Sequence, residues 1–106
     1  MNNETKLMSV RDAIIMAMSE EMRSDENVFL MGEDVGIFGG DFGTSVGMLE
    51  EFGAERIRDT PISENAISGC AIGAAMTGMR PIVDVTFMDF VVYMMDNIVN
   101  QAAKTR

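Results

Sequence analysis

The sequence contains no histidine, the side chain whose ordinary pKa best suits proton transfer near neutral pH. Nucleophile systems of the Ser-His-Asp and Cys-His types and the usual zinc sites are therefore excluded within this chain. Any acid–base chemistry must come from carboxyl groups, lysines, the single Tyr93 or a bound cofactor.

Cysteine is almost absent as well, since Cys70 is the only one and no disulfide can form within one chain. This fits a reducing compartment, and we expect a cytoplasmic protein. In "SGCAIG" we expect Cys70 to be a small core residue, with a reactive thiol as the less favoured alternative. No apolar run reaches the roughly 18 residues of a membrane span, and "MNNETKL" does not resemble an export signal.

Positive charge is scarce, because 8 lysines and arginines stand against 17 acidic residues and leave a net charge of −9. This balance argues against a nucleic-acid backbone or an anionic membrane as a partner. An acidic surface would suit a basic protein partner, although solubility alone explains the charge more simply.

The hydrophobic pattern predicts an α/β fold with a mainly parallel sheet and helices on both faces. We expect helices at residues 9–23, 45–52 and 63–77, and a fourth helix that is capped by Asp89 and still running at the last residue. We expect strands at residues 28–31, 57–60 and 82–87. Residues 32–47 are glycine-rich and predict a loop, whose spacing is unlike a nucleotide-binding loop. We expect residues 1–106 to form one domain, the front part of a longer one.

Glu64 opens an apolar segment rich in glycine and alanine, "ENAISGCAIGAAMTG". It follows the carboxyl end of a predicted strand, where parallel α/β sheets bind ligands. One interpretation is a helix-start charge that interacts favourably with the helix dipole. The other is a carboxyl group that holds or shares a proton with a ligand nitrogen. The small side chains of this helix predict close approach to another helix or subunit.

Several motifs together resemble one enzyme family. The stretch "FLMGEDVGIFGGDFG", then "DTPISE", "GAAMTGMRPI", "FMDF" and "DNIVNQAAKTR", resembles the beta subunit of thiamine-diphosphate-dependent 2-oxo acid dehydrogenases. This family includes pyruvate, branched-chain and acetoin dehydrogenases, and the stretch "FVVYMMDNIVNQAAKTR" is most similar to the acetoin enzyme. The resemblance implies the N-terminal part of a transketolase-like pyrimidine-binding domain that is truncated within a helix and inactive alone.

The resemblance also implies roles for four residues. Glu64 would hydrogen-bond the aminopyrimidine ring of thiamine diphosphate and take part in catalysis. Phe90 would lie beside the pyrimidine, with core packing as an equal alternative, and Ile62 would line the same pocket. Glu33 would belong to a proton path between paired active sites, with a solvated loop acid as the default interpretation.

The resemblance further implies an assembly of two alpha and two beta chains and a lipoyl-bearing acyltransferase partner. Magnesium and the diphosphate would be held mainly by the alpha subunit, so no metal ligand is expected here. An alternative of another class is a small acidic interaction module without catalytic function.

Overall fold

The computed structural model describes residues 7–40 and 42–104. Asp41 in the predicted loop and residues 105–106 at the end of the expected last helix lie outside these ranges. The described elements are α1 (Val10–Ser24), β1 (Val28–Gly32), α2 (Met48–Phe52), β2 (Ile57–Asp59), α3 (Glu64–Met76), β3 (Arg80–Asp84), η1 (Met88–Met94) and η2 (Asn97–Ala102). No helix in this part of the chain is long and apolar enough to cross a bilayer.

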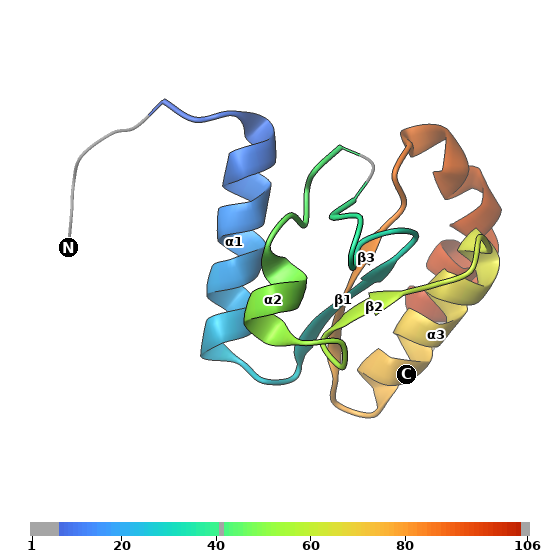
Figure 1. The fold of residues 1–106 in the computed structure, drawn as a ribbon. Helices are drawn as coiled ribbons and strands as arrows, with labels where there is room; N and C mark the ends of the chain where they lie inside the picture. Colours follow the sequence, from blue (N-terminus) through green and yellow to red (C-terminus); the bar gives the residue numbers. More distant parts are fainter. Residues whose placement is uncertain (1–6, 41, 105–106) are drawn as a thin grey trace.

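The sheet has three parallel strands in the order β2-β1-β3, with β1 in the centre (Figure 1). Helices α1 and α2 cover one face, and α3 with the η1–η2 segment covers the other (Figure 1). Side chains alternate along β1, so Leu30 packs toward α1 and α2 while Met31 packs toward α3. The predicted parallel α/β architecture is confirmed.

Local chemistry explains how the first helix is joined to the sheet. The Ser9 hydroxyl accepts the backbone N–H of Asp12 at 3.1 Å and caps α1. At the other end, the Arg56 guanidinium donates to the carbonyl oxygens of Met22, Asp25 and Val28. Arg56 therefore satisfies carbonyl groups at the end of α1 and fastens that helix to the start of β1.

Two predicted boundaries are wrong. The last strand begins at Arg80 and ends at Asp84, whereas the prediction placed it at residues 82–87. Pro81 is tolerated inside this strand because β3 lies at an edge of the described sheet, where one side needs no N–H donor. Helix α2 begins at Met48 rather than Ser45, since Gly47 before it has a left-handed conformation with φ of +83°.

The last segment is helical but not the regular α-helix that the pattern predicted. It begins as a 3₁₀ helix preceded by Phe87, so Asp89 does not cap it, and it widens into a π-helix at Asn97. The Asn97 amide donates to the Asn65 backbone carbonyl, the Asn65 side chain and the Ser68 hydroxyl at 2.8–2.9 Å. The widening thus begins at the residue whose side chain is fixed to α3.

Candidate functional site

The carboxyl ends of the three strands form one edge of the sheet, and the predicted site residues follow this edge. Gly32 at the end of β1 is in register with Asp59 of β2 and with Asp84 of β3. The chain leaves these positions into residues 33–47, into the connection that leads to Glu64, and into the segment that leads to Phe90. The structure therefore brings the three segments that carry the four predicted site residues to the edge where parallel α/β sheets bind ligands.

Glu64 is the first residue of α3, and its side chain is half-buried. Ser63 occupies the capping position but makes no side-chain cap, and no hydrogen bond or ion pair engages the Glu64 carboxylate within the described residues. Partial burial without a bonded partner leaves this acid available to an incoming donor. A charge that only interacts with the positive end of the helix is equally compatible with this geometry.

Aromatic rings lie beside this edge. Phe90 is half-buried and packs edge-to-face against Phe87, with ring centroids 5.5 Å apart. Phe87 in turn packs edge-to-face against Phe42, at 5.2 Å, and so connects η1 to the loop after β1. Phe90 therefore has an aromatic neighbour within the chain, and both core packing and ring stacking against a ligand stay open for it.

The other two predicted residues are placed less clearly. Ile62 is 82% exposed and lines neither of the two best-formed hollows of the described residues. Glu33 is half-buried in the turn directly after β1. The structure places both on segments of the carboxyl edge and leaves their predicted roles untested.

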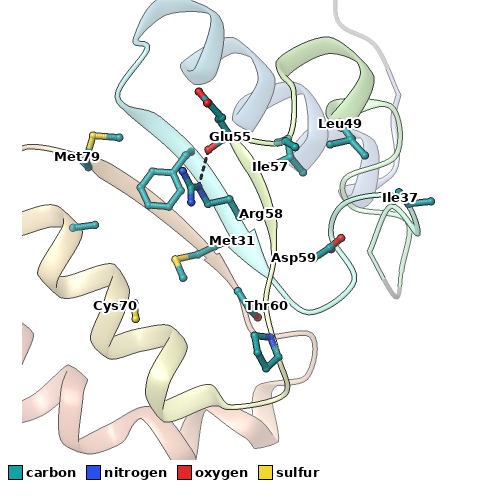
Figure 2. A pocket seen from close by; sticks show the side chains of 14 residues that line it. Met31, Ile37, Leu49, Glu55, Ile57, Arg58, Asp59, Thr60, Cys70 and Met79 are labelled. Atoms are coloured by element: carbon teal, nitrogen blue, oxygen red, sulfur yellow. Dashed lines mark hydrogen bonds between the residues drawn. The ribbon is translucent and has the colours of Figure 1, made fainter.

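A large hollow lies elsewhere, along the outer edge of β2, with a volume of about 810 Å³ (Figure 2). Met31, Cys70 and Met79 line it on the α3 side, while Leu49 and Ile57 line it on the α2 side (Figure 2). None of the four predicted site residues belongs to this lining. The prediction that Cys70 is a core residue is wrong, because Cys70 is exposed and borders the hollow.

The side chains at the carboxyl edge fit only one portion of the cofactor that the resemblance implies. A half-buried carboxylate without a bonded partner, with Phe90 on the neighbouring η1 segment, suits a planar ring that carries nitrogen donors and acceptors. The described residues contain no cluster of three or more acidic, cysteine or histidine side chains able to hold a metal ion. The described residues at this edge therefore suit the pyrimidine portion of that cofactor.

Sequence reasoning missed two residues of this edge, Asp59 and Asp84. Asp59 Oδ1 accepts the backbone N–H of Gly36 at 2.7 Å. Asp84 Oδ2 accepts the Thr44 hydroxyl at 3.2 Å, and its Oδ1 accepts the Thr86 N–H at 2.8 Å. A weak signal was available, because each of these acids is the last residue of a short strand.

Comparison with known proteins gives one family and several related subunits. Residues 6–106 match the family described as "Transketolase, pyrimidine binding domain". The chain is 52% identical over 100 residues to the 2-oxoisovalerate dehydrogenase subunit beta of Bacillus subtilis, covering 94% of this chain and 31% of that protein. It is 49% identical over 102 residues to the pyruvate dehydrogenase E1 component subunit beta of Rhizobium meliloti, covering 96% and 22%.

A mitochondrial relative gives the same picture. The pyruvate dehydrogenase E1 component subunit beta of Saccharomyces cerevisiae is 45% identical over 103 residues, which cover 97% of this chain and 28% of the yeast protein. The chain therefore spans less than a third of the length of the relatives it matches.

Proposed function

Because the chain belongs to the transketolase pyrimidine-binding domain family, we propose that it is the pyrimidine-binding part of a thiamine-diphosphate-dependent dehydrogenase beta subunit. The complete enzyme would decarboxylate a 2-oxo acid oxidatively or cleave acetoin. The observation that carries the proposal is the half-buried Glu64 carboxylate, which begins α3 at the carboxyl edge. An acidic interaction module is not favoured, because the named relatives are dehydrogenase subunits.

In this proposal Glu64 holds a proton at a ring nitrogen of the aminopyrimidine. When bound, thiamine diphosphate supplies the electron sink for the reaction. A carboxyl group at the ring nitrogen favours the tautomer whose exocyclic nitrogen can accept a proton, which explains why an acid is required in a chain without histidine. Phe90 would pack against the ring, Ile62 would contribute its exposed side chain once a partner covers it, and Glu33 would supply an acidic group for proton movement.

The proposal includes partners that this chain needs. An alpha subunit would hold magnesium and the diphosphate. Two alpha and two beta chains would assemble, and a lipoyl-bearing acyltransferase would take the acyl group. We place this enzyme in the cytoplasm, and the single cysteine supports that placement.

The test is an assay of the full-length beta chain assembled with its alpha subunit. Turnover of acetoin, pyruvate and a branched 2-oxo acid is measured with thiamine diphosphate and magnesium present, and again after their removal. We expect turnover only with the cofactor, and the highest kcat/KM with acetoin. Cofactor-independent turnover, or none with any of the three, would contradict the proposed function. A kcat/KM for pyruvate that exceeds that for acetoin by orders of magnitude would contradict only the substrate preference.

A further inference from the structure

The glycine-rich loop after β1, residues 33–47 apart from Asp41, is a folded unit within the described residues. Val35 in this loop has no exposed surface and joins the core under α1 and α2. Ser45 is only 1% exposed, and its hydroxyl donates to the Val35 carbonyl at 2.7 Å. The Gly40 N–H donates to the Asp34 carbonyl, also at 2.7 Å. Because these bonds hold the loop in one conformation, fixing the loop at one strand end also fixes its position at the other strand ends.

Two carboxylates fasten this loop to the outer strands from equivalent positions. Leu30, Ile57 and Ile82 face α1 and α2, and side chains alternate along strands, so the residues two positions further on face the same side. Those residues are Gly32, Asp59 and Asp84, which are in register across the sheet. The two acids thus flank a glycine, on strands roughly 10 Å apart.

The loop is fitted closely around these acids. A Cβ added at Gly36 would lie 2.5 Å from Asp59 Oδ2, and a Cβ added at Gly32 would lie 2.8 Å from the Asp84 carbonyl oxygen. Neither glycine needs a left-handed backbone, so the close approach of the two acidic strand ends is the reason for the missing side chains.

The Asp59 bond also fixes the connection that delivers Glu64. The Thr60 N–H donates to the Gly32 carbonyl at 3.0 Å, one residue after the Asp59–Gly36 bond. The connection is thus tied both to the end of β1 and to the loop, just before it runs through Pro61 and the exposed Ile62 to the start of α3. Asp84 has the corresponding position at the end of β3. It accepts a hydrogen bond from Thr44 of the loop, and it precedes the segment that contains Phe90.

We propose that Asp59, assisted by Asp84, is a positioning residue: its carboxylate clamps the loop at Gly36 and thereby holds Glu64 at the place where the pyrimidine binds. This inference rests on the proposed function. The Asp59 carboxylate accepts a hydrogen bond from the loop, and in this proposal its effect on the cofactor passes through Glu64.

The test uses the full-length beta chain assembled with its alpha subunit, and two measurements. The first is the dissociation constant of thiamine diphosphate with magnesium. The second is amide hydrogen exchange of the loop without cofactor. Asp59→Ala removes the acceptor, and we expect fast exchange at Gly36 and about tenfold weaker cofactor binding, since a hydrogen bond to a charged group is lost. Asp59→Asn keeps an acceptor oxygen, and we expect both values to stay near wild type.

Asp25→Ala is the matched control. Asp25 Oδ1 also accepts a backbone N–H, that of Asn27 at 2.9 Å, but before β1 at the opposite edge of the sheet. We expect normal cofactor binding in this variant. If Asp59→Ala does not fold, Thr44→Val removes the longer bond to Asp84 without changing charge, and we expect about threefold weaker binding.

Each other result separates the two claims. A wild-type assembly that does not bind thiamine diphosphate overturns the proposed function and this inference with it. Cofactor binding by wild type together with unchanged affinity in Asp59→Ala or, where that variant does not fold, in Thr44→Val overturns the inference alone. Equal weakening in Asp59→Ala and Asp25→Ala, or in Asp59→Ala and Asp59→Asn, also overturns it, because a general loss of stability or of charge would then explain the data.

Discussion

The two faces of the sheet differ in how completely they are covered. On the face under α1 and α2, Met22, Leu30, Val35 and Met48 are each at most 2% exposed. On the face under α3, the best covered positions are Met94 and Ile67, at 3% and 4%, and Met31 is 9% exposed. The hollow along β2 is lined from both faces, and on the α3 face it leaves Cys70 exposed.

This difference separates stability from function. The sealed face has the packing of a finished core, so changes there should act on folding. The open face includes the helix that begins at Glu64, and much of the surface of that helix has no cover within the described chain. In the proposed enzyme, the open face would be covered by other parts of the assembly.

The largest effect should come from the sealed face. Leu30→Ala should lower the free energy of unfolding of the full-length beta chain by about 3–5 kcal/mol, because a buried isopropyl group is lost and a cavity is left. Met31→Ala, its neighbour on the open face, should cost about 2 kcal/mol, since its surroundings can relax into the hollow. Urea unfolding measures both, and equal costs would contradict the distinction between the faces.

An intermediate effect of opposite sign should come from the open face. A Cβ added at Gly73 meets no other atom within 4 Å, so Gly73→Leu should stabilise α3 by about 1 kcal/mol in the beta chain alone. In the assembled enzyme the same change should block association with another subunit, as seen by sedimentation. Ala75→Leu, at another exposed position of α3, is the control and should leave assembly intact. If Gly73→Leu still formed normal tetramers, the face of α3 around Gly73 would not contact another subunit.

The smallest effect concerns an ion pair at the rim of the sealed face. Two hydrogen bonds from Arg23, of 2.5 and 2.7 Å, lower the pKa of Glu51 below its ordinary value of 4.5. A lowered pKa in the folded state adds stability above pH 4.5, and this stability is lost as the pH falls through the folded-state pKa. Glu51→Gln should therefore lower the thermal midpoint slightly near neutral pH, and the difference should vanish in acid. A difference in thermal midpoint that persists below the folded-state pKa of Glu51 would contradict a stabilising role for the ion pair. Near neutral pH, high salt should reduce the difference because the pair is exposed.

The sequence was sufficient for the architecture and the family but not for the irregular segments. Alternating apolar runs and helical periods gave the parallel α/β class, and the motif combination gave a resemblance that the family match confirms. Periodicity could not show that the last helix is 3₁₀ and then π, because that geometry depends on contacts such as those of Asn97 with α3. The exposure of Cys70 was missed for a similar reason, since an unfilled hollow has no local sequence pattern.

The candidate site was predictable only in part. Glu64 stood out because it is a lone acid before an apolar helix, and Phe90 and Ile62 followed from the resemblance. Asp59 and Asp84 did not stand out, because their importance comes from the register of three strands rather than from spacing along the chain. Residues whose role depends on contacts between distant segments cannot be recognised from a single sequence by spacing alone.

The central claim is that Glu64 supplies an acidic proton to the cofactor, and deuterium exchange at the thiazolium carbon of thiamine diphosphate tests it most directly. The measurement compares wild type and Glu64→Gln in the assembled enzyme, with the thermal midpoint recorded alongside. Glutamine keeps the size and part of the hydrogen bonding but cannot supply that proton. We predict exchange that is slower by about 10²–10⁴-fold, with only modestly weaker cofactor binding. Unchanged exchange with a lowered thermal midpoint would contradict the claim and leave Glu64 as a charge that stabilises the start of a helix.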